Sequence, residues 1–269
     1  GGGYNALTGP GFLLSLKAIL FDLDETLTLH ERPFEEAYLA TCLPAALKYG
    51  VEAARIVVAQ YEAANRLCNG LQSRPFLRRI RIGGRDILWG DARGDSSDLR
   101  MLASEIPTFR AQVWRTALEA VGIQDASMTR SMANAFPDEM RSRIAAFPDA
   151  LPCLDAISGR YKVAVVTNGL PATQREKLRL ARLDRFFKVI AVSGDVGVAK
   201  PHAPILQAAL SALGVSASEA ALVGDRLELD VAGAKAVGMG AIWLNRHVIT
   251  RDAAQPAPDH EIGTLGQLL

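Results

Sequence analysis

Cysteine is scarce in this sequence. The 269 residues include three cysteines, Cys42, Cys68 and Cys153, which lie far apart and form no CxxC pair. A disulfide framework requires an even set of cysteines, and a structural zinc site requires clustered Cys or His ligands. Neither is indicated here. The composition instead favours a reducing compartment, and we expect a cytoplasmic protein.

Long apolar runs and a strong excess of one charge are also missing. No segment approaches the ~18–20 apolar residues of a membrane-spanning helix, so we expect no membrane association. The formal net charge of +1 gives no overall attraction to nucleic acid or to an anionic membrane surface. With 49% hydrophobic and 22% charged residues, the chain has the composition of a globular protein with a sizeable core. Residues 1–15 lack the basic start of a signal peptide, and we expect them to be a loosely ordered leader.

Short aliphatic segments recur along the chain and alternate with helical patterns. The strand-like segments begin at Lys17 and occupy residues 161–169, 186–195, 220–230 and 239–246. Helical patterns follow at residues 172–183, 203–214 and 230–238. Short runs of Val, Ile, Leu and Ala are typical of strands buried on both faces, as in a parallel sheet. The alternation predicts a doubly wound, Rossmann-like α/β sheet with right-handed crossovers.

The region from residue 30 to 147 interrupts this alternation with helical patterns. Residues 52–70 and 108–122 carry apolar side chains at helical spacing, and Trp114 on the second of these stripes is expected to pack in a core. Residues 91–98 are expected to form a loop. We therefore predict an inserted helical domain at 30–147, with an α/β core built from 16–29 and 148–269.

Polar residues stand where the predicted strands end. In open α/β sheets, ligands bind outside the carboxyl ends of the strands, so residues at these ends are expected to share one crevice. The residues concerned are Asp22 and Asp24 after the first strand, Thr167 and Asn168 after the second, Lys200 after the third and Asp225 after the fourth.

These residue types suit phosphoryl transfer at a magnesium ion. Several carboxylates together form the oxygen-rich site that Mg²⁺ prefers, and a lysine, a hydroxyl, an amide and backbone N–H groups bind phosphoryl oxygens. Spacing by two places Asp22 and Asp24 on the same side of an extended chain. One of them is then able to attack phosphorus while the other transfers a proton.

Four motifs in this order resemble those of the haloacid-dehalogenase-like (HAD) superfamily. They are "DLDETLT" at 22–28, "VVTNG" at 165–169, "VAKP" at 198–201 and "GDRLELD" at 224–230, and "FPDALPCLDAI" at 147–157 resembles the return from an inserted domain. Within the superfamily, the chain is similar to phosphatases that carry a helical cap after the first strand. The resemblance covers the chain outside residues 30–147 and implies a helical cap there.

The resemblance implies a role for each matching residue. Asp22 would be the nucleophile that forms an aspartyl-phosphate, and Asp24 the general acid and base. Thr167, Asn168, Gly169 and Lys200 would bind the transferring phosphoryl group. Mg²⁺ would be held by Asp22, the backbone carbonyl of Asp24 and Asp225, while Asp230 would contact the ion indirectly. The substrate would be a small phosphorylated metabolite, and the reaction hydrolysis of its phosphomonoester.

Several alternatives remain open at this point. A phosphomutase, a 2-haloacid dehalogenase and a non-catalytic phosphate-binding module each use part of the same motifs. Asp230 alone also suits a charge at a helix start. The arginines between Arg74 and Arg85 form either a solvated face or a surface that binds an anionic substrate. Glu25 stands where the family often has glycine, so we expect the turn there not to require one. The sequence does not indicate an oligomeric state.

Overall fold

A computed structural model describes residues 16–269, so the leader expected at residues 1–15 lies outside the described residues. The described chain divides into two compact units. The first comprises residues 16–29, 145–168 and 178–269, and the second comprises residues 30–144 and 169–177. Among the helices of residues 16–269, none combines the length and the apolar character required to cross a bilayer.

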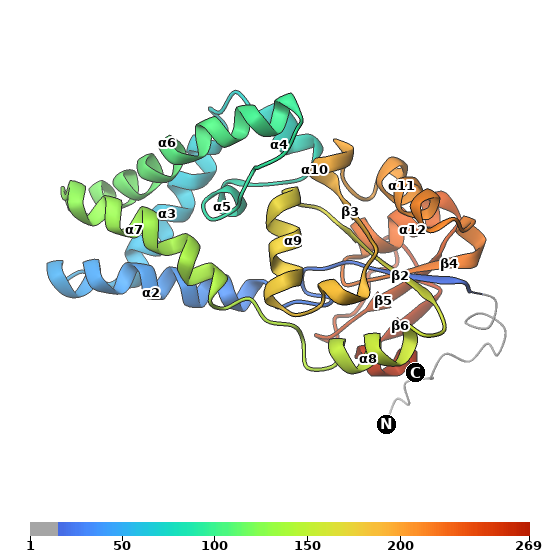
Figure 1. Cartoon of the computed structure of the whole chain (residues 1–269). Coiled ribbons are helices and arrows are strands. Elements are labelled where there is room, and N and C mark those ends of the chain that lie inside the picture. The colour runs from blue at the N-terminus through green and yellow to red at the C-terminus, as the bar shows by residue number, and fades with distance from the viewer. Residues whose placement is uncertain (1–15) are drawn as a thin grey trace. The chain divides into compact units, whose positions relative to one another are not determined.

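The first unit is built on a six-stranded sheet in which every neighbouring pair is parallel (Figure 1). The strand order is β3-β2-β1-β4-β5-β6. The strands are β1 (Ala18–Phe21), β2 (Lys162–Thr167), β3 (Val189–Val192), β4 (Ala220–Gly224), β5 (Gly240–Leu244) and β6 (His260–Ile262). The predicted doubly wound α/β sheet is confirmed. Five of its strands lie within the predicted segments, and the short β6 was not predicted.

Helices cover both faces of this sheet. On one face, α11 (Ala203–Leu213) and α12 (Ala232–Val237) pack against the strands through a cluster of buried aliphatic side chains. On the other face, α8 (Ala150–Ile157) packs against a 3₁₀ turn near the C-terminus (Figure 1). The short helix α10 (Ser193–Val196) follows β3, and α9 (Pro171–Leu180) contributes residues to both units. Since β1 and β4 are buried on both faces, a continuous aliphatic run is the composition that they require.

The second unit is helical. Its helices are α2 (Glu31–Tyr49), α3 (Ala53–Cys68), α4 (Arg74–Arg79), α5 (Gly84–Ile87), α6 (Ser97–Ala120) and α7 (Ala126–Arg141), together with the first part of α9. Aromatic rings fill its core: Tyr38 stacks on Phe136 with centroids 4.7 Å apart, and Trp114 meets Phe136 edge-on at 5.6 Å. The predicted packing role of Trp114 is therefore confirmed.

Helix α6 begins earlier than the sequence pattern predicted. The apolar stripe at 108–122 lies mostly in the second half of this helix, which starts at Ser97, inside the loop expected at 91–98. The side chain of Ser96 accepts a hydrogen bond from Leu99 N at 3.1 Å. The helix continues through Pro107, which lacks a backbone N–H and is usually unfavourable inside a helix. Leu99 and Leu102, which precede Pro107, are buried on the same side of α6 as the predicted apolar stripe. Their burial explains why the helix extends to the N-terminal side of the proline.

Candidate active site

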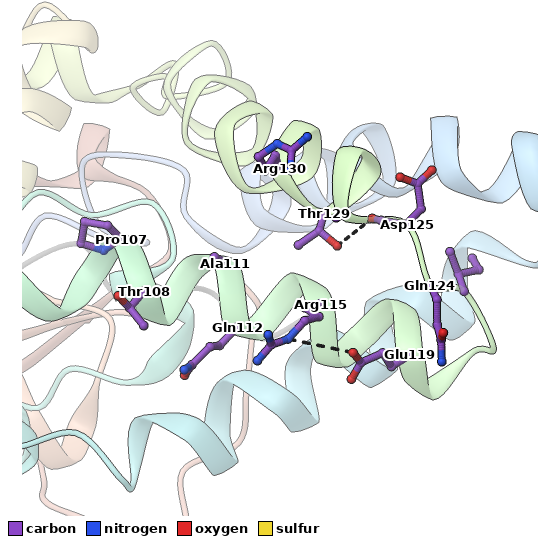
Figure 2. A pocket seen from close by; sticks show the side chains of 12 residues that line it. Pro107, Thr108, Ala111, Gln112, Arg115, Glu119, Gln124, Asp125, Thr129 and Arg130 are labelled. Carbon is purple, nitrogen blue, oxygen red and sulfur yellow. Dashed lines mark hydrogen bonds and ion pairs between the residues drawn. The ribbon is translucent and has the colours of Figure 1, made fainter.

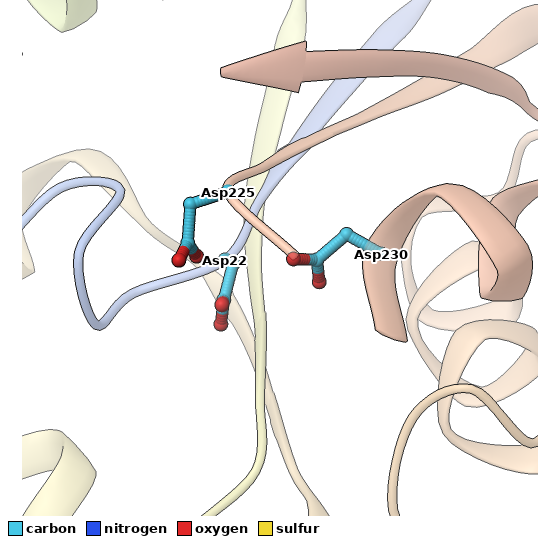
Figure 3. Close-up of side chains that lie close together, drawn as sticks. All are labelled: Asp22, Asp225 and Asp230. Carbon is cyan, nitrogen blue, oxygen red and sulfur yellow. The ribbon is translucent and has the colours of Figure 1, made fainter. Parts of the chain in front are cut away.

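Three aspartates meet at the carboxyl end of the sheet. Asp22 follows β1 directly, Asp225 follows β4, and Asp230 lies in a π-helical turn (Leu227–Val231) after Asp225. A backbone hydrogen bond of 2.9 Å from Asp22 N to Val223 O joins the ends of the two central strands. Each aspartate offers a carboxylate oxygen, and these oxygens all lie within 4.8 Å of one another (Figure 3). Such π-helical turns occur frequently at functional sites.

Lys200 joins two of these carboxylates. Its Nζ lies 2.7 Å from Oδ1 of Asp22 and 2.7 Å from Oδ1 of Asp230. The Lys200 residue is only 1% exposed. Burial by itself lowers the pKa of a lysine, but the charges of Asp22 and Asp230 outweigh this and raise the pKa of Lys200 above its ordinary value. The ammonium therefore stays charged inside the protein.

One ammonium does not balance three carboxylates. Burial raises the pKa of Asp22 to about 7, since the opposing charge of Lys200 is partly offset by the negative charge of Asp230. Burial and the charges of Asp22 and Asp230 raise the pKa of Asp225 to about 8. With all three carboxyls ionised, the site would carry more negative charge than Lys200 neutralises, and without a cation the raised pKa values of Asp22 and Asp225 favour protonation instead. Converging carboxylate oxygens with surplus charge fit a hard divalent cation such as Mg²⁺.

Asp230 has both carboxylate oxygens engaged within the protein. Oδ1 accepts from Lys200, and Oδ2 accepts from the backbone N–H of Arg226 at 3.0 Å. The carboxylate packs directly on Gly224, where an added Cβ would lie 2.2 Å from Cγ of Asp230. These contacts assign Asp230 a holding function for Lys200 and for the turn. The alternative of a charge at a helix start is compatible with this position, because Asp230 lies in the first turn of the π-helical segment and accepts from the N–H of Arg226, the residue that precedes that segment.

Asp24 lies in a tight turn after β1 and is not part of the three-carboxylate cluster. The carbonyl of Leu23 accepts from the backbone N–H of Leu27 at 2.9 Å and of Thr28 at 2.9 Å, which closes the turn. Glu25 has φ 59°, in the left-handed region that favours glycine. The turn thus forms without glycine, as expected, although its backbone has the glycine-type conformation and Glu25 adopts it against its steric preference.

The second predicted motif lies next to Lys200. Thr167 ends β2 and is 1% exposed. The side chain of Asn168 accepts from Lys200 N at 2.8 Å and donates to Lys200 O at 3.3 Å, so its amide holds the backbone that carries the lysine. Gly169 belongs to the second unit. Thr167, Asn168 and Lys200 thus lie within the first unit beside the carboxylate cluster.

Sequence reasoning missed two residues near the site, Arg246 and Asp149. Arg246 follows β5 and forms a two-pronged ion pair with Asp149, with both N–O distances 2.9 Å. The same guanidinium donates to the backbone carbonyl of Thr26 at 2.9 Å. The signal for Arg246 is a polar residue just past the carboxyl end of β5, like the polar residues that follow β1, β2 and β4.

The arginines of the second unit differ in their surroundings. Arg78, Arg79 and Arg81 are exposed. Arg85 is half-buried, pairs with Glu31 through two contacts of 2.8 Å and lies with its guanidinium carbon 4.5 Å from the centre of the Phe34 ring. Arg85 is thus held by its own unit, and the exposed Arg79 likewise pairs with Asp98 of that unit at 2.6 Å.

A groove of about 840 Å³ runs along α6 and α7 in the second unit (Figure 2). Its lining includes the Arg115–Glu119 pair, with an N–O distance of 4.0 Å, and the Thr129 hydroxyl, which donates to the carbonyl of Asp125 at 3.0 Å. None of the predicted site residues lines this groove. The groove and the carboxylate cluster therefore have no residue in common.

The family model described as "haloacid dehalogenase-like hydrolase" matches residues 16–238, which include all the motifs named above. The chain belongs to the haloacid dehalogenase-like hydrolase family. The family resemblance expected from the motifs is confirmed, and with it the expectation that the protein is a hydrolase of the HAD-like type.

Relatives and solved structures of this HAD-like hydrolase agree with that assignment. A phosphoserine phosphatase of Thermus thermophilus is 36% identical over 94% of this chain and 98% of its own length. A 2-haloacid dehalogenase structure from Pseudomonas syringae has a TM-score of 0.62 at 26% identity, and a HAD phosphatase structure from Thermococcus onnurineus has 0.55 at 28%. For each of these two structures, the match covers 94% of this chain and 96% of the chain in that structure.

Proposed function

We propose that this HAD-like hydrolase is a Mg²⁺-dependent phosphatase that hydrolyses a small phosphomonoester through an aspartyl-phosphate. The observation that carries the proposal is the cluster of Asp22, Asp225 and Asp230, in which the buried ammonium of Lys200 bridges Asp22 and Asp230. The similarity to a phosphoserine phosphatase over nearly the full chain supports the same reaction class.

The metal site would use Asp22 and Asp225, with the backbone carbonyl of Asp24. Asp230 would act indirectly, because both of its oxygens are already bonded. A bound Mg²⁺ would supply positive charge near the phosphoryl oxygens as they gain charge in the transition state. Lys200 and the ion together favour ionised Asp22, which is the form able to attack.

The reaction would proceed in two steps at Asp22. A carboxylate oxygen of Asp22 attacks phosphorus, the bond from phosphorus to the leaving oxygen breaks, and that oxygen takes the proton of the Asp24 carboxyl group. Asp24, now ionised, then removes a proton from water, whose oxygen attacks phosphorus as the bond between phosphorus and Asp22 breaks. Inorganic phosphate leaves, and both aspartates return to their starting forms.

The phosphoryl group would be bound by Thr167, Asn168, Gly169 and Lys200. The Thr167 hydroxyl and the backbone N–H groups after β2 would donate to its oxygens. The amide of Asn168 contributes mainly by holding Lys200, since it contacts the lysine backbone at both its oxygen and its nitrogen.

The helical region at 30–147 is proposed to be a cap that selects the leaving group and excludes water during the reaction. The substrate would be a small phosphorylated metabolite. A cytoplasmic location is proposed because Cys42, Cys68 and Cys153 are all free and buried thiols, as expected in a reducing compartment.

A dehalogenase is the second candidate, because a 2-haloacid dehalogenase is among the similar structures. Such an enzyme would need neither the proton-transferring Asp24 nor a site for a divalent cation. The convergence of three carboxylates on a site with one ammonium suits a divalent cation and therefore favours the phosphatase.

The test is a panel of phosphomonoesters, including phosphoserine, assayed for phosphate release with and without Mg²⁺. We expect turnover that requires Mg²⁺ and is lost in Asp22→Asn. Chloride release from a 2-haloacid would replace the proposal with the dehalogenase, and conversion of a phosphate ester to its isomer would replace it with a mutase. Binding of phosphate without turnover of any ester would favour a binding module.

A further inference from the structure

Arg246 occupies a place in the first unit where several functional segments meet. It follows β5 at the carboxyl end of the sheet, and its side chain is 12% exposed. Nη1 and Nη2 donate to the two carboxylate oxygens of Asp149 at 2.9 Å each, and Nη2 also donates to the carbonyl of Thr26 at 2.9 Å. The guanidinium carbon lies 4.0 Å from the centre of the Phe147 ring. A flat, two-pronged group is required to make these contacts together.

The Thr26 carbonyl is part of the turn that carries Asp24. Thr26 is fully buried, so its carbonyl would lack a partner if the arginine were removed. Its hydroxyl is directed to Oδ1 of Asp225 at 3.5 Å, which links the turn to the carboxylate cluster. A displacement of Thr26 is therefore passed to Asp24 two residues away, through a turn closed by backbone hydrogen bonds.

Asp149, the carboxylate partner of Arg246, lies on the segment by which the chain re-enters the first unit. Residues 27–29 and 145–147 pair through hydrogen bonds from Phe147 N to Leu27 O at 2.9 Å and from Leu29 N to Ala145 O at 3.0 Å. Asp149 directly follows this pairing, and its Oδ2 also accepts from Leu265 N at 2.9 Å. Arg246 thus fastens together the turn of Asp24 and the paired segments that follow it.

We propose that Arg246 is a positioning residue for the general acid and base: it holds the Thr26 carbonyl so that Asp24 stays aligned for proton transfer. The inference rests on the proposed phosphatase function, since it requires a leaving oxygen that needs a proton. Arg246 does not itself contact the reacting atoms. Asp149 orients the guanidinium and is therefore a second positioning residue.

A series of substituted phenyl phosphates separates this role from a general loss of structure. The value of kcat/KM covers the steps up to the break of the bond to the leaving group. A poorly basic leaving group such as p-nitrophenolate departs without a proton, whereas unsubstituted phenolate benefits from one. Misalignment of Asp24 therefore makes the dependence of log kcat/KM on leaving-group pKa steeper, while loss of folded enzyme lowers all substrates alike.

The variants are Arg246→Lys and Arg246→Met, with Asp149→Asn as a second route should the methionine variant fold poorly. For phenyl phosphate we expect kcat/KM to fall about tenfold or more, a part of the ~10²–10⁴ that a general acid contributes. For p-nitrophenyl phosphate we expect kcat/KM to fall less than about threefold, while kcat falls more, because hydrolysis of the aspartyl-phosphate still needs Asp24 as a base. Asp24→Asn serves as the reference for complete loss.

The matched control is Lys235→Met. Lys235 forms an ion pair with Asp259, which accepts from Ala241 N at 2.9 Å near the start of the same strand β5. Breaking this pair should leave the leaving-group dependence unchanged. An unchanged slope in all the Arg246 and Asp149 variants, or an equal loss with every ester, overturns the positioning role alone. A wild-type protein that turns over no ester at all overturns the proposed function, and the positioning role with it.

Discussion

The ammonium of Lys200 lies 2.7 Å from a carboxylate oxygen of Asp22, and the two side chains are only 1% and 12% exposed. A second carboxylate, that of Asp230, lies at the same distance from the ammonium. Buried charges of this kind are stable only as a set, because each desolvated ion depends on its partners. The set ties Lys200, which is proposed to bind the phosphoryl group, to the proposed nucleophile Asp22.

Removal of the Lys200 ammonium should therefore affect both stability and activity. We expect Lys200→Met to lower the free energy of unfolding by about 3–5 kcal/mol, the range found when one partner of a buried pair is deleted. Activity should fall by about 10³-fold or more, because charge stabilisation in the transition state is lost as well. Thermal melts and steady-state kinetics measure the two effects.

A double-mutant cycle with Asp230→Asn shows whether the two residues act together. Since the Lys200 ammonium contacts Asp230 at 2.7 Å, the double variant should be less destabilised than the sum of the single variants by about 1 kcal/mol or more. Strictly additive losses of stability would contradict the buried network.

Gly224 is the second point at which a small change should have a large effect. A Cβ at this position would lie 2.2 Å from Cγ of Asp230, and that carboxylate is held in place by Lys200. Gly224→Ala should therefore displace Asp230 and misplace the ammonium, lowering kcat by about tenfold to a hundredfold, as misalignment at an active site does. As a control, Gly159→Ala meets no atom within 4 Å and should leave kcat unchanged. Equal kcat in both variants would be inconsistent with the tight packing at Gly224.

The metal-free protein should lose stability as the pH rises. Burial and neighbouring charge raise the pKa of Asp225 to about 8, and burial raises that of Asp22 to about 7. In the unfolded chain these carboxyls titrate near ~4, so between that pH and the folded pKa values the native state holds more protons than the unfolded state. Stability contributed by these protonated carboxyls is complete below about pH 4 and is lost as the pH rises through about 7–8.

Mg²⁺ should reverse this loss, because a bound cation replaces the protons. We expect the rise in melting temperature on adding Mg²⁺ to be small at about pH 6 and clearly larger at about pH 8.5. Melts in EDTA and in Mg²⁺ at both pH values measure the difference, and Asp225→Asn should abolish it. A magnesium-induced shift that is independent of pH would show that proton and metal do not compete at these carboxyls.

The three cysteines should be unreactive in the native protein. Burial raises the pKa of Cys42 and of Cys153 to about 12 each, and burial likewise raises the pKa of Cys68 above its ordinary value. Because the thiolate is the reactive form, a disulfide reagent such as DTNB at about pH 8 should label the native protein slowly. Unfolding in guanidinium should release three thiols. Rapid labelling of one thiol before unfolding would contradict the buried positions.

Much of the first unit was predictable from sequence because a buried parallel strand requires an uninterrupted aliphatic run. The sequences of β1, β2 and β4 contain such runs. A polar residue follows each of these strands, at the edge of the sheet where ligands are expected to bind. The three-residue β6 has no such run: His260 and Glu261 are polar, and its place follows from pairing with β5. Local pattern does not encode that pairing.

Residues that act through the backbone were harder to predict than those with a chemical signature. The roles of Arg246 and Asn168 depend on which carbonyls and N–H groups they meet, and this is fixed only when distant segments fold together. The left-handed conformation at Glu25 was also not predictable, because glutamate rarely adopts a positive φ.

Trapping the covalent intermediate is the most direct test. Rapid acid quench during turnover of a phosphomonoester with Mg²⁺, borohydride reduction of the acyl phosphate and peptide mass spectrometry identify the phosphorylated side chain. The account predicts reduction of residue 22 to homoserine, more of it in Asp24→Asn than in wild type if hydrolysis of the intermediate is the slower step, and none in Asp22→Asn. Phosphate release with residue 22 unmodified, or an acyl phosphate at another residue, would contradict the account.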